Sequence, residues 1–351
     1  MRNVSASLTS NFFFLVVGAY FLIAGLQAAA GVLIPITFSA LLAYLLHPIV
    51  SYLEDRRFPP ALAAALTLIV AGVVALGIAT LISAQLESVI DDVPVLQEQI
   101  FEKINRTQSE ISMNFGIDPT AQVSWFKARA AEFLTFDATA FQSALRATTG
   151  IFSALVLIPI YTFFLLLYRD FFRRGFVGLF VEHRAEAIND MLHEIQRVIR
   201  RYLAGLLIVI YVVAVLNTIG LVAIGMEHAL FFGTLAALLT VIPYIGIIVG
   251  SAVPALVAFF THDSLLMPLG IIGVFTLVQL IEDNFITPNI VGHKMRLNPP
   301  VAILAVITGG YVWGIWGMMV SIPVAAAMKI VFDHVENLKP IGAMMGLRQT
   351  R

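Results

Sequence analysis

Apolar runs of bilayer-spanning length are the feature that most constrains how this chain can fold. Of its 351 residues, 59% are hydrophobic and 12% are charged, whereas a soluble domain carries about 25% charged residues. Several runs reach the roughly 20 residues that a helix needs to cross a membrane. We therefore expect an all-α polytopic integral membrane protein, with the lipid bilayer as its immediate surroundings.

Eight hydrophobic segments divide the chain. The first, residues 12–26, is followed by small residues and resembles a cleavable signal peptide. A second apolar run follows at once, which favours an uncleaved first helix; we expect the third helix to end near Ala84 and the fifth to begin at Tyr202. The expected parts are helices one to three at 1–84, an amphipathic helical insert at 85–149, helices four and five at 150–228 with a charged helical loop at 169–201, a core of two broken segments and one helix at 229–335, and a tail at 336–351.

The two long apolar segments of the core are each broken near the middle. Ala229–Thr261 would be about 50 Å long as a straight helix, against a hydrocarbon core of about 30 Å, and a Pro-Tyr-Ile-Gly sequence lies near its centre. Pro299–Phe332 contains Gly309, Gly310 and Gly314. Two models fit this pattern: six full crossings plus two re-entrant hairpins, or eight crossings. A break at membrane depth survives only where protein or a wet cavity surrounds it.

A polar cluster separates the two broken segments and consists of Gln279, Glu282, Asp283 and Asn284. A carboxylate at the centre of a bilayer costs about 2.5–3.5 kcal/mol, but much less at a helix end. The two carboxylates are therefore candidates either for coupling to protons or sodium ions, or for plain interfacial caps. Gln279 lies one helical turn before Asp283 and is expected to share its face.

The distribution of basic residues predicts the sidedness of the chain, because arginine and lysine mark cytoplasmic loops. Residues 169–201 hold seven arginines, whereas residues 85–149 hold five basic against nine acidic residues. This places both termini and the 169–201 loop in the cytoplasm, and the insert outside. Lys294 and Arg296 also fall inside if the broken segments are hairpins, which favours the hairpin model.

The chain lacks the motifs of several other function classes. It has no cysteine, which excludes disulfides and thiolate chemistry. It has no GxxxxGK[ST] sequence, so ATP is not the direct energy source, and no HExxH or GxSxG sequence. No basic stripe marks a nucleic-acid surface. We therefore expect no enzyme, no cofactor, no metal site and no nucleic-acid partner.

Three sequences in the C-terminal third follow one another in a characteristic order: VIPYIGIIVGSAVP, QLIEDNFITPNIVG and GGYVWGIWGMMVSIP. In this order they resemble the autoinducer-2 exporter family of bacterial membrane permeases, and the resemblance extends from about Phe12 to Pro340. It implies a multi-pass secondary transporter of the bacterial inner (cytoplasmic) membrane that exports a small polar signalling molecule of the autoinducer-2 type, driven by an ion gradient. Together with the amphipathic insert, it favours a homo-oligomer. The alternatives are a cation/proton antiporter and a non-transporting membrane scaffold.

The candidate binding residues are short hydrogen-bonding side chains and residues at the breaks. Such side chains suit a polyol-like ligand, and glycines at a hairpin tip expose backbone N–H groups. The candidates for substrate binding are Asn217, Thr240, Pro243, Tyr244, Gly246, Ser251, Gln279, Asn284, Thr308 and Gly310, and those for ion coupling are Glu282 and Asp283. Structural roles stay open, because a buried Asn can bond across helices and glycines spaced by four residues can pack helices together.

Overall fold

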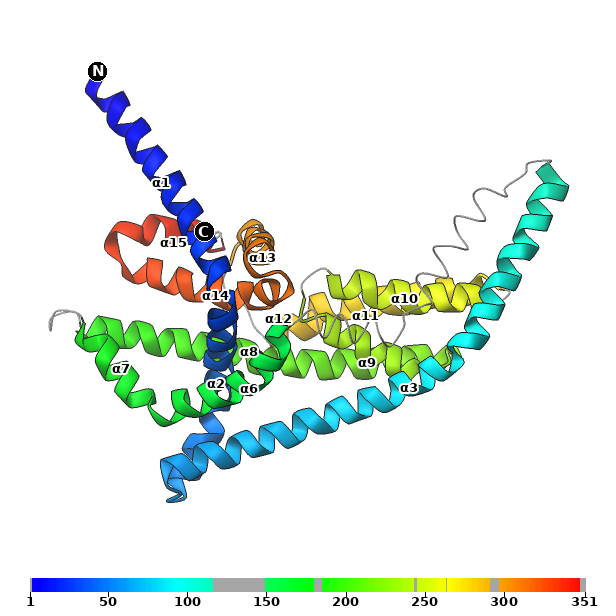
Figure 1. The fold of residues 1–351 in the computed structure, drawn as a ribbon, viewed down its shortest axis with the longest axis horizontal. Coiled ribbons are helices and arrows are strands. Elements are labelled where there is room, and N and C mark those ends of the chain that lie inside the picture. The colour runs from blue at the N-terminus through cyan, green and yellow to red at the C-terminus, as the bar shows by residue number, and fades with distance from the viewer. Residues whose placement is uncertain are drawn as a thin grey trace. The chain divides into compact units, whose positions relative to one another are not determined.

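A computed structural model of the chain describes residues 2–115, 149–179, 185–242, 245–262, 264–290 and 297–347. Within these ranges the chain is helical and contains no β-strand, apart from an isolated bridge between Leu297 and Gly346 (Figure 1). The prediction of an all-α protein is therefore confirmed.

The helices follow one another with short connections. In chain order they are α1 (Arg2–Ala28), α2 (Ala30–Asp55), α3 (Pro60–Phe115), α6 (Thr149–Leu167), α7 (Arg169–Gly178), α8 (Ala185–Ala223), α9 (Ala229–Leu239), α10 (Ile245–Thr261), α11 (Leu266–Ile281), the π-helix η2 (Glu282–Ile286), α12 (Thr287–Ile290), α13 (Pro299–Trp313), α14 (Ile315–His334), the 3-10 helix η4 (Glu336–Leu338) and α15 (Lys339–Met345).

Five stretches of the described helices are long and apolar enough to cross a membrane. They are Ala30–Asp55, Pro60–Val89, Ala185–Ala223, Leu266–Ile290 and Ile315–His334. Shorter apolar helices lie at Val16–Ala28, Val156–Leu167, Ala229–Leu239, Gly246–Thr261 and Pro299–Trp313. Large apolar side chains such as Ile69, Val73 and Leu76 stay exposed, as expected where lipid covers the surface. The prediction of a polytopic membrane protein is confirmed.

The chain forms two compact units, each built from separate stretches of sequence. Unit 1 comprises Met1–Leu68, Gly150–Ala204 and His293–Arg351, and unit 2 comprises Ile69–Thr149 and Gly205–Gly292. Two of the boundaries fall inside α3 and inside α8, which are both continuous helices.

Two predicted helix boundaries are wrong. The third helix does not end near Ala84, because α3 continues to Phe115. Beyond Ala84 its side chains Leu86 and Val89 pack against the core of unit 2, which extends the helix past the apolar run. Likewise no helix begins at Tyr202, since α8 runs from Ala185 to Ala223 without a proline to interrupt it. The predicted insert beyond residue 115 lies outside the described residues.

The first broken segment is a helical hairpin within unit 2. Helices α9 and α10 contact each other, and α10 also contacts α11. A Cβ added to Gly246 would overlap the carbonyl of Leu239, and one added to Gly250 would lie 2.7 Å from the Cβ of Ala236. The contact partners run backwards along α9 as α10 runs forwards, so the two helices are antiparallel. The predicted break is confirmed, although Pro243 itself lies outside the described residues.

The second broken segment is a helical hairpin within unit 1, with its turn at Gly314. This glycine adopts a φ of 59° and a ψ of −138° between α13 and α14, a conformation that residues with a side chain rarely adopt. The closest approach joins Gly309 and Gly317, whose backbones leave no room for a Cβ on either residue. The turn is anchored by Trp313, whose Nε1 donates to the carbonyl of Leu26 at 2.9 Å.

The lengths of the hairpin helices bear on whether they span the bilayer. Helices α9, α10 and α13 hold 11, 17 and 15 residues, which corresponds to about 16, 25 and 22 Å, against a hydrocarbon core of about 30 Å. Helices α9 and α13 are shorter than the about 17–25 residues of a spanning helix, and α10 is at the lower end of that range, so a crossing by α9 or α13 alone would require a thinner bilayer.

Candidate functional site

The polar cluster predicted between the broken segments lies in unit 2, with Gln279 near the end of α11 and Glu282, Asp283 and Asn284 on the π-helix η2. Helix α11 widens at Glu282 into η2, where the N–H of Thr287 donates to the carbonyl of Glu282, five residues earlier. Pro288 follows directly and explains the wide turn, because it lacks an N–H and its ring would clash with the carbonyl of Asn284 in a regular helix. Single π-helical turns of this kind occur frequently at functional sites.

The π-helical turn separates the two carboxylates. Asp283 is exposed and its Oδ1 accepts a hydrogen bond from Nε2 of Gln279 at 2.9 Å, so these two side chains share a face as predicted. Asn284 is also exposed and donates from Nδ2 to the carbonyl of Leu280 at 2.8 Å. Glu282 is half-buried instead, and its Oε2 is buried without a partner among the described residues. Glu282 is therefore the carboxylate that faces protein.

Two more unpartnered polar atoms lie on α8, within the same unit. Asn217 is only 2% exposed, and its Oδ1 accepts no hydrogen bond from the described residues. The Oγ1 of Thr218, the next residue, is buried and unpartnered as well. Thr218 faces α9, since a Cβ added to Gly233 of α9 would lie 2.7 Å from the backbone nitrogen of Thr218. Thr218 was missed as a candidate, although two adjacent polar residues inside an apolar run are a usable signal.

Helices α8 and α11 run antiparallel in the same part of unit 2. A Cβ on Gly220 would meet the side chain of Val274, and Val213 belongs to one buried cluster with Ala237 and Val278. Asn217 lies one turn after Val213, and Glu282 lies one turn after Val278. Because the helices are antiparallel, these two steps lead in opposite directions, so Asn217 and Glu282 lie about two helical turns apart on the two helices, on either side of the level of Val213 and Val278.

An unpartnered buried polar group is expensive, at about 1–3 kcal/mol for a neutral group and more for a charged one. Buried polar atoms without a partner are few in native structures and each needs an explanation. The three such side-chain atoms of the described residues, on Asn217, Thr218 and Glu282, all belong to unit 2. They fit a site whose hydrogen-bonding partner is a ligand, an ion or water.

The other candidates do not join this cluster. Thr240 and Ser251 satisfy their own hydroxyls, by donating to Ala237 O at 2.6 Å and to Ile247 O at 2.8 Å. Gly246 packs against α9, as described above. Thr308 is exposed on α13 and Gly310 faces the side chain of Met318, and both belong to unit 1. Pro243 and Tyr244 lie outside the described residues.

No group of three or more His, Asp or Glu side chains within the described ranges could hold a metal ion. The carboxylates of η2 are split between two environments, and Asp283 already accepts a side-chain hydrogen bond. The chemistry available to the cluster is therefore hydrogen bonding and the exchange of a proton or monovalent cation at Glu282.

Comparison with known proteins adds independent evidence. The model described as the AI-2E family transporter matches residues 11–337 of the chain. The putative transport protein YrrI of Bacillus subtilis (strain 168) is 25% identical over 319 residues, which is 88% of each chain. The putative transport protein YhhT of Escherichia coli (strain K12) is 21% identical over 326 residues, 93% of this chain and 91% of the relative. The AI-2 transport protein TqsA of the same strain is 21% identical over 329 residues, 92% of each.

Proposed function

Because the chain belongs to the AI-2E transporter family, we propose that it is a secondary transporter that exports a small polar signalling molecule of the autoinducer-2 type. The name of one relative, an AI-2 transport protein, supports this substrate class. The absence of a P-loop sequence supports an ion gradient as the energy source. We place the protein in the bacterial inner membrane, where such a gradient is available.

The observation that carries the proposal is that the unpartnered buried atoms of the described side chains, on Asn217, Thr218 and Glu282, all lie in unit 2. A polyol-like molecule has hydroxyl groups that both donate and accept hydrogen bonds. In our proposal one hydroxyl donates to Oδ1 of Asn217 and another exchanges hydrogen bonds with Oγ1 of Thr218, while Glu282, about two turns away, carries the coupling ion. The seam between α8 and α11 is then the binding site, and the first hairpin, beside it, is the element that moves.

A second candidate function is favoured by Glu282 alone. A carboxylate buried in a membrane segment needs a proton, a cation or a hydrogen-bond partner to offset its desolvation. Because its Oε2 has no partner in the described part of the chain, a proton or sodium ion is a suitable occupant. The protein would then be a cation/proton antiporter, with Glu282 as the exchanging group.

The test of both candidates is flux into sealed vesicles that contain the purified protein, with and without imposed proton or sodium gradients. Glu282→Gln keeps the shape of the side chain but cannot release a proton, so we expect gradient-driven flux to fall about tenfold or more. Asp283→Asn is the matched control, since Asp283 is exposed and paired with Gln279. It should retain most of the flux.

The outcome distinguishes the candidates. Autoinducer-2 flux that depends on the gradient supports the exporter, whereas cation exchange without autoinducer-2 flux supports the antiporter. Equal, gradient-dependent flux in the wild-type protein and in Glu282→Gln would remove Glu282 from the coupling step. A complete lack of flux under all gradients would instead favour a membrane scaffold.

We also propose that the two hairpins re-enter the membrane and that both termini are cytoplasmic. The short helices α9, α10 and α13 support re-entry. The native chain has no cysteine, so single cysteines can be introduced cleanly. A cysteine in place of Lys294 should react with a membrane-impermeant reagent only from the inside, and one in place of Arg106 only from the outside. External labelling at position 294 would restore the model of eight crossings.

We further propose a homo-oligomeric assembly, which the long amphipathic part of α3 supports. Light scattering of the detergent-solubilised protein measures its mass directly. A mass equal to one chain would contradict this proposal without affecting the transport site, which lies within one unit.

A further inference from the structure

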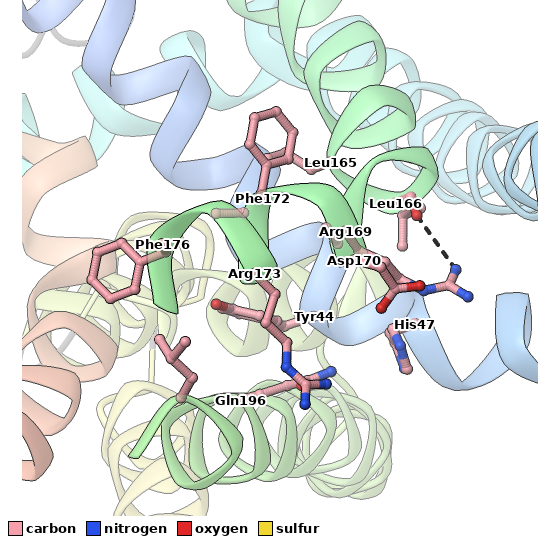
Figure 2. A pocket seen from close by; sticks show the side chains of 13 residues that line it. Tyr44, His47, Leu165, Leu166, Arg169, Asp170, Phe172, Arg173, Phe176 and Gln196 are labelled. Carbon is pink, nitrogen blue, oxygen red and sulfur yellow. Dashed lines mark hydrogen bonds between the residues drawn. The ribbon is translucent and has the colours of Figure 1, made fainter. Parts of the chain in front are cut away.

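Unit 1 contains a cavity that the transport proposal does not use. Its volume is about 260 Å³, and its lining comes from α2, α6, α7 and α8 (Figure 2). The polar side chains that line it are Tyr44, His47, Arg169, Asp170, Arg173 and Gln196. Stretches of chain far apart in sequence therefore build one polar recess.

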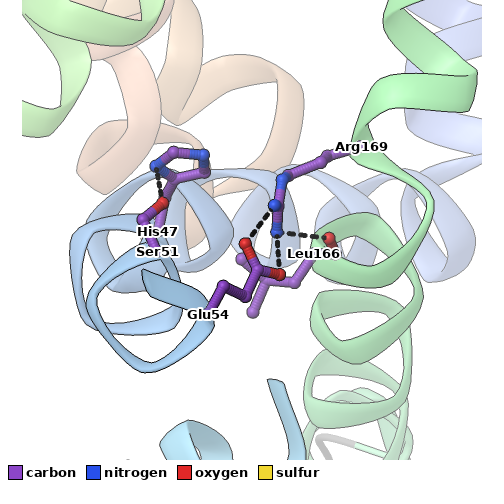
Figure 3. Close-up of polar contacts among 5 residues, drawn as sticks. All are labelled: His47, Ser51, Glu54, Leu166 and Arg169. Atoms are coloured by element: carbon purple, nitrogen blue, oxygen red, sulfur yellow. Dashed lines mark hydrogen bonds and ion pairs between the residues drawn. The ribbon is translucent and has the colours of Figure 1, made fainter. Parts of the chain in front are cut away.

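Arg169 connects two of the helices that form this recess, because it binds Glu54 of α2 from the first residue of α7. The chain turns sharply at Tyr168, between α6 and α7, and brings Arg169 against the end of α2. There its guanidinium binds both carboxylate oxygens of Glu54, with Nη1 at 2.9 Å from Oε1, and Nη1 also donates to the carbonyl of Leu166 at 3.3 Å (Figure 3). The hydrogen bonds that Arg169 donates to the carboxylate of Glu54 raise the pKa of Arg169 above its ordinary value, so this side chain stays charged.

Arg173 lies one helical turn further along α7 and still has donors to offer. Its Nε donates to Oδ1 of Asn189 at 2.8 Å, which fixes the side chain. The two terminal nitrogens find no acceptor in the described part of the chain. In Figure 2 the guanidinium of Arg173 lies beside Gln196 of α8. The side-chain amide of Gln196 can donate hydrogen bonds to the same ligand.

The charges around the recess leave a surplus of one positive charge. Arg169 and Arg173 line it, and Arg200 lies within electrostatic range of His47. Glu54 and Asp170 supply two negative charges against these three positive ones. A monoanion would balance the recess, whereas a zwitterion would leave the surplus in place.

The surroundings of the recess are those of a membrane interface. Helix α7 carries three arginines together with exposed aromatic side chains, including Phe171 and Phe172, a composition typical of a helix that lies at the lipid headgroups. On the neighbouring helices, Ile49 of α2 and Phe164 of α6 expose apolar side chains, which lipid tails would cover. The volume is somewhat below the roughly 300–1,000 Å³ of typical small-molecule pockets, which suits a headgroup.

We propose that this recess binds the headgroup of an anionic phospholipid, with a single negative charge on its phosphodiester. The terminal nitrogens of Arg173 and the amide of Gln196 bind the phosphate oxygens, in the bidentate way that guanidinium favours. The acyl chains lie outside, along the apolar faces of α2 and α6. Basic pockets between membrane helices bind anionic headgroups by the same chemistry. The proposal is independent of what the protein transports.

The test is a binding titration of the full-length protein in neutral detergent, with phosphatidylglycerol as the probe. Phosphatidylcholine is the control probe with a zwitterionic headgroup, and glycerol phosphate is the control probe without acyl chains. We expect saturable binding of phosphatidylglycerol and much weaker binding of the other two. Arg173→Ala should weaken the binding of phosphatidylglycerol about tenfold or more, the effect of losing a hydrogen bond to a charged group.

Arg174→Ala is the matched control, because Arg174 has the same charge on the same helix but does not line the recess. It should bind phosphatidylglycerol like the wild-type protein. Gln196→Leu tests the second phosphate contact if Arg173→Ala proves unstable in a thermal melt. Equal binding of all three probes, tight binding of glycerol phosphate, or equal losses in Arg173→Ala and Arg174→Ala would each overturn the proposal.

Discussion

Replacing Gly317 by alanine should force the two helices of the second hairpin apart, and we expect the variant to melt well below the wild-type protein. The new Cβ would overlap the backbone carbonyl of Gly309 and press on the Cβ of Trp313 at 3.1 Å. Backbone atoms cannot rotate away, so α13 and α14 would have to separate. Overpacking costs about 1–3 kcal/mol and occasionally more. The measurement is the thermal melting midpoint in detergent, together with the size-exclusion profile.

Gly72→Ala is the matched control for this prediction. Gly72 lies inside α3, and a Cβ there would meet nothing within 4 Å. Because alanine is the better helix former by up to about 1 kcal/mol, this variant should melt at or slightly above the wild-type temperature. A Gly317→Ala variant that melts like the wild-type protein would show that the two hairpin helices do not pack as closely as described.

The fold was predictable where a local signal decides it. Composition and the length of the apolar runs predict the all-α membrane class, and the Gly and Pro residues predict both breaks. The sequence does not identify the closest glycine contact of the second hairpin, which joins Gly309 and Gly317. Which glycines meet across a turn depends on the geometry of that turn. The spacing of glycines within one helix does not determine this geometry.

The site was predictable in composition but not in geometry. The sequence identifies Asn217, Glu282 and Asp283 as candidates, yet it gives the two carboxylates equal roles. Consecutive residues of a helix point in different directions, and only the packing in the structure shows that Glu282 is half-buried whereas Asp283 is exposed. The recess of unit 1 was beyond prediction, since Glu54 and Arg169 are 115 positions apart and no local pattern pairs them.

Replacing Asn217 by leucine should abolish transport while leaving the protein as stable as before, or more so. Leucine is close to asparagine in size, and it removes a buried oxygen that has no partner. Removing an unsatisfied polar group is neutral or stabilising for the fold. If that oxygen receives a hydrogen bond from the substrate, its loss should lower flux about tenfold or more. Thermal melting and vesicle flux measure the two effects separately.

The most direct test of the transport site compares autoinducer-2 flux in vesicles of the wild-type protein, of Asn217→Leu and of Ser251→Ala. Ser251 serves as the control because its hydroxyl donates to its own helix, at Ile247 O. If Asn217 binds the substrate, Ser251→Ala should transport like the wild-type protein, and Asn217→Leu should lose flux with an unchanged or higher melting temperature. Normal flux in Asn217→Leu would show that Asn217 does not bind the substrate, and a loss of flux accompanied by an equal loss of stability would show a structural role instead.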